Sequence, residues 1–119
     1  DYGVMREHYL YHYLAEWAGD DGWVVSMYDE IRKFNYMGDV QFVKGEITGK
    51  RVENGQCLVD ISVSMINQRD EETVRCTATV ALPSKEHGIV MLPEASPETK
   101  RRAVEMLARH RELMAAKKA

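Results

Sequence analysis

Residues 4–18 read VMREHYLYHYLAEWA, and this stretch decides the fold. Four of its apolar side chains recur at the i, i+3, i+4, i+7 spacing of one helix face. These are Leu10, Tyr13, Leu14 and Trp17, with Met5 and Tyr9 beside them. Gly19 follows as a C-terminal stop, and Asp20-Asp21-Gly22 supplies a turn. The spacing predicts an amphipathic helix with a buried stripe.

After this helix the apolar period changes from 3.6 residues to 2, which predicts strands. We expect four strands, over residues 23–34, 40–52, 57–65 and 73–82. The third alternates apolar and polar residues most clearly, and Asn54-Gly55 before it is a strong hairpin signal. One helix cannot bury its stripe alone, so we expect an antiparallel sheet, with its strands in meander, to wrap around it.

Three small residues refine the expected strands. Gly45 and Gly49 are expected bulge or bend positions in the second strand. Pro83 ends the fourth strand, because proline cannot donate to a central ladder.

The C-terminal part of the chain has a different character. Residues 84–95 have loop composition, and Ser96-Pro97 is an N-cap followed by proline at the first helical position. A charged helix is predicted from there to about Leu113, before a Lys/Ala tail. Its basic cluster at residues 100–102 is expected to be a solvated face, since glutamates dilute it. The chain thus divides into a body, residues 1–95, and a charged helix and tail, residues 96–119.

Composition excludes several classes of function. The chain has 119 residues, which fits one domain, and 45% are hydrophobic, enough for a core. A net charge of −3 gives no basic footprint for nucleic acid or an anionic membrane. No apolar run approaches the ~20 residues that span a bilayer. Cys57 and Cys76 fall in strand-like segments without metal-ligand spacing. We expect two buried, reduced thiols in a cytoplasmic protein, and favour this over a cross-strand disulfide.

Several short motifs carry a family resemblance. Residues 31–39, IRKFNYMGD, are followed by VKGEI at residues 43–47. Asn67-Gln68 is followed by Glu71 or Glu72 and then by ATVALP at residues 78–83, while residues 14–22 read LAEWAGDDG. In order and spacing, residues 2–83 resemble MaoC-like acyl-thioester hydratases and dehydratases. The resemblance implies an α+β hot-dog fold, in which a curled antiparallel sheet wraps a long central helix. It also implies that the body lacks the strand preceding that helix.

The resemblance further implies a reaction and an assembly. Family members add water reversibly to a 2-enoyl-CoA thioester, as lyases, in a homodimer or in a heterodimer with another hot-dog domain. Coenzyme A is then part of the substrate, and neither a separate cofactor nor a metal is expected. Nucleic acid and membrane are not expected partners.

The expected site residues follow from the same resemblance. Family hydratases use an Asp and a His, the latter in a His-Gly pair just before the central helix. Here that position reads Tyr2-Gly3, so the histidine is absent, and the aspartate would precede the chain. Gly3 matches the glycine whose N–H faces the thioester carbonyl, and the Val4 amide is its neighbour. Tyr2 and Gly3 are therefore the candidate catalytic positions and Val4 a candidate for substrate binding, with simple packing the alternative for Tyr2.

Other charged residues are also candidates for a role in a site. Arg32 and Lys33 are candidates to bind the phosphates of coenzyme A, and the alternative is that they lie on a solvated strand face. Arg69 and Arg75 are weaker candidates for the same role. His8 and His12 lie one helical turn apart but have no evident third ligand, which favours ordinary surface histidines. Asp29 would be buried if it shared the face of Val25, Met27 and Ile31, but we expect a surface carboxylate at a strand irregularity.

Three functions stay open. The first is a subunit or domain of a MaoC-like enoyl-CoA hydratase or dehydratase. The second is a non-catalytic, acyl-binding partner in a heteromeric hydratase, indicated by the missing histidine. The third is an acyl-CoA thioesterase, which needs a carboxylate near the central helix; Glu7 is the only acid well placed on its first turns.

Overall fold

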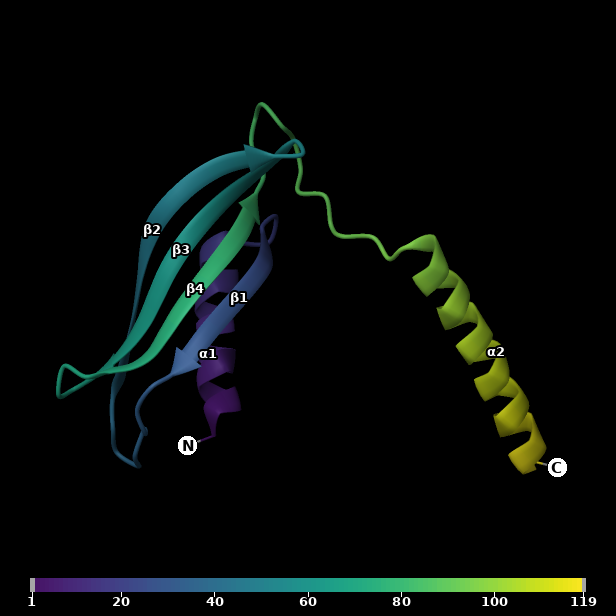
Figure 1. The fold of residues 1–119 in the computed structure, drawn as a ribbon, viewed down its shortest axis with the longest axis horizontal. Helices are drawn as coiled ribbons and strands as arrows, with labels where there is room; N and C mark the ends of the chain where they lie inside the picture. The colour runs from purple at the N-terminus through teal and green to yellow at the C-terminus, as the bar shows by residue number, and fades with distance from the viewer. Residues whose placement is uncertain (1, 119) are drawn as a thin grey trace.

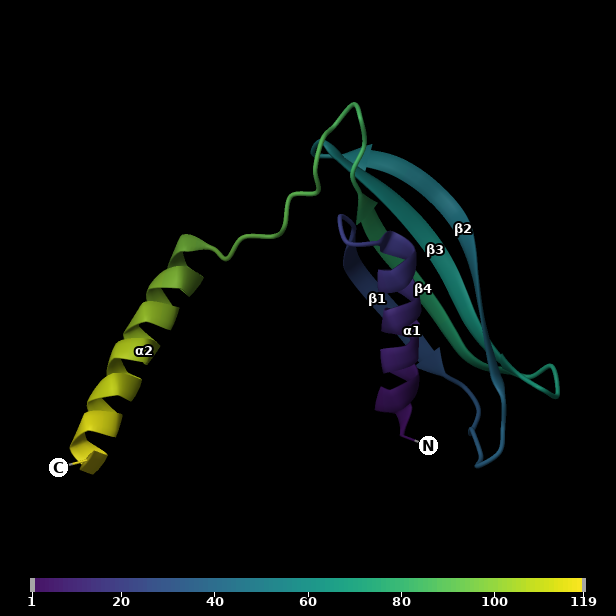
Figure 2. The ribbon, with the colours of Figure 1, turned by 180° about the vertical axis from the view of Figure 1, so that it is seen from behind.

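The computed structural model describes residues 2–118, so Asp1 and Ala119 lie outside the described residues. The elements are α1 Gly3–Ala18, β1 Trp23–Ile31, β2 Gln41–Glu53, β3 Gln56–Asn67, β4 Glu72–Leu82 and α2 Pro97–Lys118. One antiparallel sheet, in the order β1-β4-β3-β2, curls around one side of α1 (Figures 1 and 2). The expected α+β class is confirmed.

Helix α1 buries one stripe against the sheet. Leu10 and Leu14 are fully buried and Tyr13 is half-buried, but Trp17 is 43% exposed. The prediction that Trp17 lies in the core is therefore wrong: it lies at the margin, beside Gly45 and Ile47 of β2. The stripe extends instead toward the helix start through Arg6, which is only 3% exposed. Gly19 ends the helix with a φ of 74°, as predicted.

Strands β3 and β4 form the centre of the sheet and supply most of the core. Their inward-facing residues alternate with polar outward-facing ones, as the period of two predicts. The buried apolar side chains are Val59, Ile61, Val63, Met65, Val74, Cys76, Ala78 and Val80. Asn54 and Gly55, with φ of 49° and 75°, form the tight turn between β2 and β3.

The strand order differs from a meander. Strands β2, β3 and β4 follow one another, but β1 pairs with β4, from Trp23 opposite Ala81 to Ile31 opposite Val74. The chain then crosses to the far edge through residues 32–40 before β2 begins. The expectation of four strands in meander is therefore wrong for β1. The short turn after α1 sets β1 beside the helix, where its neighbour is β4 and not β2.

A register shift between Val24 and Ser26 decides which side of the sheet the rest of β1 presents. With Val25 as the extra residue, Met27, Asp29 and Ile31 share the inner face, and Asp29 lies opposite Cys76, half-buried. The expected surface position of Asp29 is thus corrected in part: the residue points to the inner face but is only half-buried. Strand β1 also ends at Ile31 and not at residue 34, although Arg32 and Lys33 still donate their N–H groups to the Thr73 carbonyl, at 2.8 and 3.3 Å.

The two glycines of β2 have different roles. A second register shift lies between Ile47 and Gly49, so Gly49 adjoins a bulge as predicted. Gly45 instead faces α1, where an added Cβ would lie 2.8 Å from the Tyr13 hydroxyl oxygen. Gly45 therefore allows the helix to approach the strand, and no register shift lies at this position.

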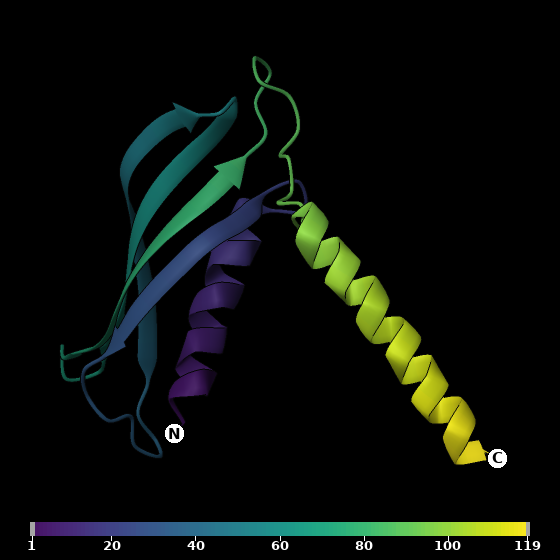
Figure 3. The ribbon, with the colours of Figure 1, turned by 45° about the vertical axis from the view of Figure 1, so that its right-hand side comes forward.

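The segment after β4 leads to a separate helix. Ser84 and Gly88 form an isolated bridge, and Gln56 Nε2 donates to the Met91 carbonyl at 3.0 Å. Ser96 Oγ accepts from the Thr99 N–H at 3.2 Å and caps α2. Helix α2 continues to Lys118, so the predicted end near Leu113 is wrong; Ala115, Ala116 and two lysines are good helix formers. Every described residue of α2 is exposed, and the helix stands away from the body (Figure 3).

Among residues 2–118, no helix is long and apolar enough to cross a membrane. Both cysteines are free: Cys76 is buried and Cys57 half-buried. Cys76 lies opposite Val63, six positions along β3 from Cys57, which is roughly 20 Å in an extended strand.

Candidate functional site

An open groove lies where α1 begins and β1 ends. Its volume is about 280 Å³, and it is lined by Gly3, Arg6, Ile31, Arg32, Lys33 and Phe34. A Cβ on Gly3 would lie 2.5 Å from Ile31 Cδ1, so a glycine there lets the helix start approach the strand end. The groove is thus set by the contact between the first residue of α1 and the last residue of β1.

Cationic side chains line the groove. Arg6 is buried at its base and donates through Nη1 to the Lys33 carbonyl at 2.6 Å. The first N–H groups of an α-helix have no intrahelical acceptor and carry the positive end of the helix dipole. Three of the six lining residues are cations, and none is an acid or a histidine. This composition suits an anion or a developing negative charge.

The structure brings together three of the five predicted site residues, because Gly3, Arg32 and Lys33 all line this groove. Tyr2 and Val4 flank it at the helix start, with exposures of 81% and 70%. Tyr2 occupies the N-cap position, and its side chain makes no capping hydrogen bond. Both predicted phosphate ligands are paired: Arg32 Nη2 lies 2.9 Å from Glu30 Oε2, and Lys33 Nζ lies 3.0 Å from Glu71 Oε1.

The two weaker cationic candidates lie elsewhere. Arg69 bonds both carboxylate oxygens of Asp39, at 2.9 and 3.1 Å, and Arg75 Nε lies 2.8 Å from Glu72. Neither residue lines the groove.

The Asn67-Gln68 motif builds the turn behind the groove. Asn67 is buried; its Oδ1 accepts from the Arg69 and Glu71 N–H groups, and its Nδ2 donates to Glu71 Oε2 at 2.8 Å. Gln68 donates to Asp39 at 2.7 Å and accepts from the Val40 N–H, which joins this turn to the crossing segment. The motif by itself does not predict this role. Its composition carries a signal, since Asn and Asp in a four-residue turn are typical of side-chain-to-backbone bonding.

The charges of this turn perturb its acids. Hydrogen bonds from Asn67, Lys33 and Arg69 lower the pKa of Glu71 to about 2. The pKa of Asp39 lies far below its ordinary range, chiefly because Arg69 donates to it. Both carboxylates are therefore ionised and fully committed to the turn, and neither is poised to take a proton from water.

The remaining candidates are not assembled into a reactive site. His8 and His12 are exposed, and His12 Nε2 lies 3.8 Å from Glu16. Within residues 2–118, no three His, Cys, Asp or Glu side chains are grouped to hold a metal ion. Burial, and then the nearby charge of Asp29, raises the pKa of Cys76 to about 11, which makes it a poor nucleophile.

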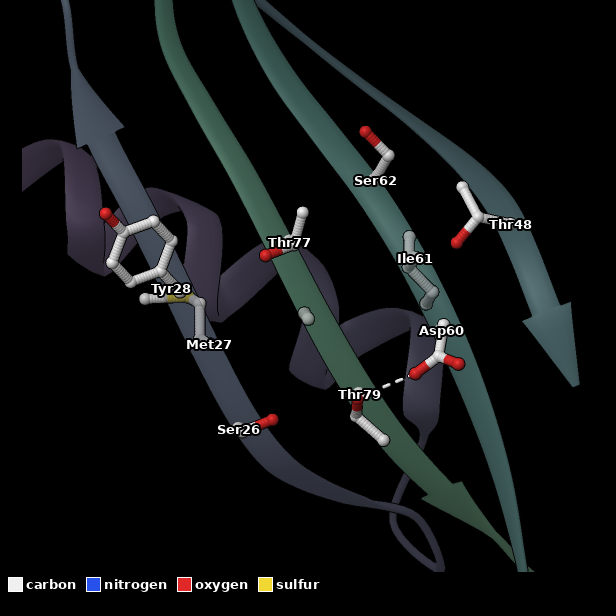
Figure 4. Close-up of a pocket in the computed structure, with 10 residues that line it drawn as sticks. Ser26, Met27, Tyr28, Thr48, Asp60, Ile61, Ser62, Thr77 and Thr79 are labelled. Atoms are coloured by element: carbon white, nitrogen blue, oxygen red, sulfur yellow. Dashed lines mark hydrogen bonds between the residues drawn. The ribbon is translucent and has the colours of Figure 1, made fainter. Parts of the chain in front are cut away.

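A second depression, of about 530 Å³, lies on the outer face of the sheet, away from α1 (Figure 4). Its lining includes the hydroxyl groups of Ser26, Thr48, Ser62, Thr77 and Thr79. Its one carboxylate, Asp60, accepts from Thr79 Oγ1 at 2.8 Å and pairs with Arg51, which lowers its pKa. Asp60 is thus a paired carboxylate, and no histidine or second acid is among the described residues that line this depression, so they form no catalytic pair.

Comparison with known proteins identifies the architecture. No family model and no curated protein matches this sequence. The ChsH1-ChsH2 complex from Mycobacterium tuberculosis matches at 22% identity and a TM-score of 0.57 over 66% of this chain and 58% of that one. The (R)-hydratase from A. caviae involved in PHA biosynthesis matches at 16% identity and a TM-score of 0.59, over 69% of this chain and 61% of that one. The chain has the hot-dog fold.

The predicted hot-dog class is thereby confirmed, with α1 as the central helix, although at 16 residues it is of moderate length. The chain spans less than two thirds of the length of either hot-dog structure. At these identities the likeness establishes the fold, and the chemistry rests on the groove at the start of α1.

Proposed function

We propose that this chain is the thioester-binding part of a hydratase or dehydratase, a lyase that adds water to a 2-enoyl-CoA. One observation carries the proposal: the groove at the start of the hot-dog helix is cationic and contains a helix N-terminus, but no acid or histidine lines it. A site of this kind can bind a thioester and stabilise negative charge. It cannot by itself move the protons of the reaction.

The chemistry assigns each groove residue a role. When water adds to the β-carbon, a C–O bond forms there, a proton reaches the α-carbon, and the thioester oxygen becomes enolate-like. The backbone N–H groups of Gly3 and Val4, in the first turn of α1, would donate to that oxygen, where the helix dipole favours negative charge. Arg32 and Lys33 would exchange Glu30 and Glu71 for the phosphates of coenzyme A. Coenzyme A enters as part of the substrate, and the reaction needs no other cofactor.

The general base and acid come from outside the described groove, in this proposal from a second hot-dog domain, in a homodimer or a heterodimer. Strands β1 and β2 are the edges of the described sheet, each paired on one side, and an unpaired edge is a template for another chain. The ChsH1-ChsH2 neighbour supports such pairing, since it is itself a complex. Two free thiols support a reducing compartment, the cytoplasm.

Two other functions remain as alternatives of unequal weight. A non-catalytic acyl-binding partner is favoured by the same absence of a histidine at Tyr2, and it would use the groove in the same way. A thioesterase needs a carboxylate at the thioester. Glu7, the acid considered for it, is exposed and does not line the groove, so this function is the weakest.

The experiment combines turnover with binding. The native protein is mixed with crotonyl-CoA and with a bulkier enoyl-CoA, and loss of the conjugated thioester absorbance is followed with and without a second hot-dog chain. Hydration only in the mixture supports a heterodimer in which the second chain supplies the base and acid. Hydration by this chain alone supports a homodimer in which a second copy supplies them. Thioester binding without turnover in either case favours the acyl-binding partner.

Binding to the groove has its own variant pair. Replacing Arg32 and Lys33 together by glutamine (R32Q/K33Q) removes two charge-assisted contacts and weakens thioester binding roughly tenfold or more. The matched control is Lys44→Gln with Lys50→Gln, which removes the same charge from exposed β2 positions outside the groove. Equal affinity of both variants for the thioester, measured by calorimetry, would show that the groove is not the coenzyme A site.

A further inference from the structure

Helix α2 leaves an apolar stripe uncovered. It has 22 residues, which makes it about 33 Å long, and every described residue of it is exposed. Four of its five larger apolar side chains, all except Val104, and one alanine recur three, four and seven residues apart on one side of the helix, which His110 and Lys117 share. The apolar residues of this stripe are Ala103, Met106, Leu107, Leu113 and Met114. An amphipathic helix of this kind normally lies with its stripe against another surface.

The charges of α2 are sorted around this stripe. Glu98, Glu105 and Glu112 are seven residues apart, so they form one line along the helix, on the side opposite the stripe. The margins of the stripe are basic: Lys100 and Arg111 border one side, and Arg102 and Arg109 border the other. A surface that covers the stripe therefore meets a cationic rim, and a complementary surface carries carboxylates.

Net charge narrows the choice of partner. Residues 97–118 contain seven basic and three acidic residues, a charge of +4, while the whole chain carries −3, so residues 1–96 carry −7. Pairing two α2 helices would set two cationic rims against each other. The body of this chain has the opposite sign and is the better match.

One side of α1 has the complementary character. Away from the sheet it presents exposed apolar and aromatic side chains, Val4, Met5 and Tyr11, together with His8 and His12. The exposed acids and bases of residues 2–22, histidines aside, are all acidic: Glu7, Glu16, Asp20 and Asp21. The one Arg or Lys of that segment, Arg6, is buried. This surface of α1, which we call the open side, is apolar with an acidic rim.

We propose that α2 of one chain packs on the open side of α1 in a second copy, and that the exchange is reciprocal. Within one chain α2 stands clear of α1 (Figures 1 and 3). The preceding loop is held to the body by the bond from Gln56 to the Met91 carbonyl, so residues 92–96 alone lie between that bond and the helix. A two-fold arrangement gives each copy one donated and one received helix.

The first test is the oligomeric state of the full chain, measured by sedimentation over a range of concentrations. The full chain is expected to be a dimer. Replacing Leu107 and Met114 by glutamine weakens the dimer at least about tenfold, because apolar area at the contact is lost. The matched control, Ala108→Gln with Ala116→Gln, places the same residue on the far side of α2 and leaves the dimer constant unchanged. Circular dichroism confirms that both variants keep the helix.

A charge exchange tests which surface receives α2. Reversing Arg102 and Arg109 (R102E/R109E) weakens the dimer, and adding Glu7→Arg with Glu16→Arg in the same chain restores it. A monomeric full chain overturns the proposal, and so does a glutamine pair in the stripe that behaves like its control. Failure of the Glu7 and Glu16 reversals to rescue overturns the assignment to α1. None of these readouts depends on thioester binding or turnover, so failure here is distinguishable from failure of the proposed function.

Discussion

Gly22 lies where the turn after α1 enters β1, and it has no room for a side chain. An added Cβ would lie 2.5 Å from the Ala18 carbonyl oxygen and 2.8 Å from the Ala18 Cβ. The obstacle is helix backbone, which cannot rotate aside, so Gly22→Ala should destabilise the fold by about 1–3 kcal/mol. Gly49→Ala is the control, since its Cβ would meet Asp60 at 3.5 Å, an ordinary contact. Urea unfolding of both variants checks this; equal midpoints would contradict it.

The turn at residues 67–71 predicts a response to acid. The pKa of Glu71 falls from its ordinary 4.5 to about 2 because its ionised form is hydrogen-bonded in the folded state. That stabilisation is fully present above pH 4.5 and is lost as the pH falls toward about 2. Asp39 acts in the same direction, since its pKa is also lowered. We therefore expect the free energy of unfolding to decline through this window.

The variant Arg69→Gln removes contacts from both acids, so its unfolding free energy should depend less steeply on pH below 4.5 than that of the wild type. Arg75→Gln, an exposed arginine on Glu72 outside the turn, is the control. Denaturant titrations from pH 7 to pH 2.5 measure this. Parallel profiles for wild type and Arg69→Gln would show that the turn does not supply the acid dependence.

At the scale of the element, the hairpin of β2 and β3 depends on two residues with positive φ. Gly55, at 75°, has no atom near the site of a Cβ, so Gly55→Ala tests backbone conformation alone. We expect a loss of about 1 kcal/mol in unfolding free energy, the usual penalty for a left-handed L-residue. Asn54→Gly should be neutral or nearly so. Thermal unfolding of both variants distinguishes a conformational penalty from a lost contact.

The elements themselves were largely readable from sequence, since periodicity is a local signal. The helix at residues 4–18, the Asn54-Gly55 turn and the alternation of β3 and β4 are confirmed. The pairing of β1 with β4 was missed, because apolar spacing identifies a strand but not its neighbour. The inward position of Asp29 was missed for a related reason: a one-residue bulge at Val25 shifts every later side chain to the other face.

The groove was foreseen only in part. Gly3, Arg32 and Lys33 were named from motifs, and the fold brings them together. Arg6 was not named, because an arginine on a helix stripe normally lies on the surface, and its burial depends on how the crossing segment passes the helix start. The pairing of Lys33 with Glu71 was equally out of reach, since it joins residues far apart in sequence.

At the scale of the whole molecule, α2 contributes to assembly and not to the body. Since every described residue of α2 is exposed, deleting residues 97–119 should leave the unfolding free energy of the dilute protein within about 0.5 kcal/mol. The unfolding midpoint of the full chain should rise more steeply with protein concentration than that of the truncated chain, which lacks the α2 contact. If the truncated chain has a much lower free energy of unfolding at every protein concentration, α2 instead packs on the body of its own chain.

The pairing of β1 with β4 also sets an order of events in folding. Strands β2, β3 and β4 are consecutive in sequence, and each pairs with the next. Strand β1 instead pairs with β4, from which β2 and β3 separate it in sequence. Closing that long loop costs chain entropy before any contact compensates it. The β1–β4 pairing should therefore form last in folding and separate first in unfolding. Shortening the Met27 side chain to alanine would then chiefly accelerate unfolding. Shortening the Val63 side chain to alanine would instead slow folding. The strand that ends at the groove would be the most easily detached part of the sheet.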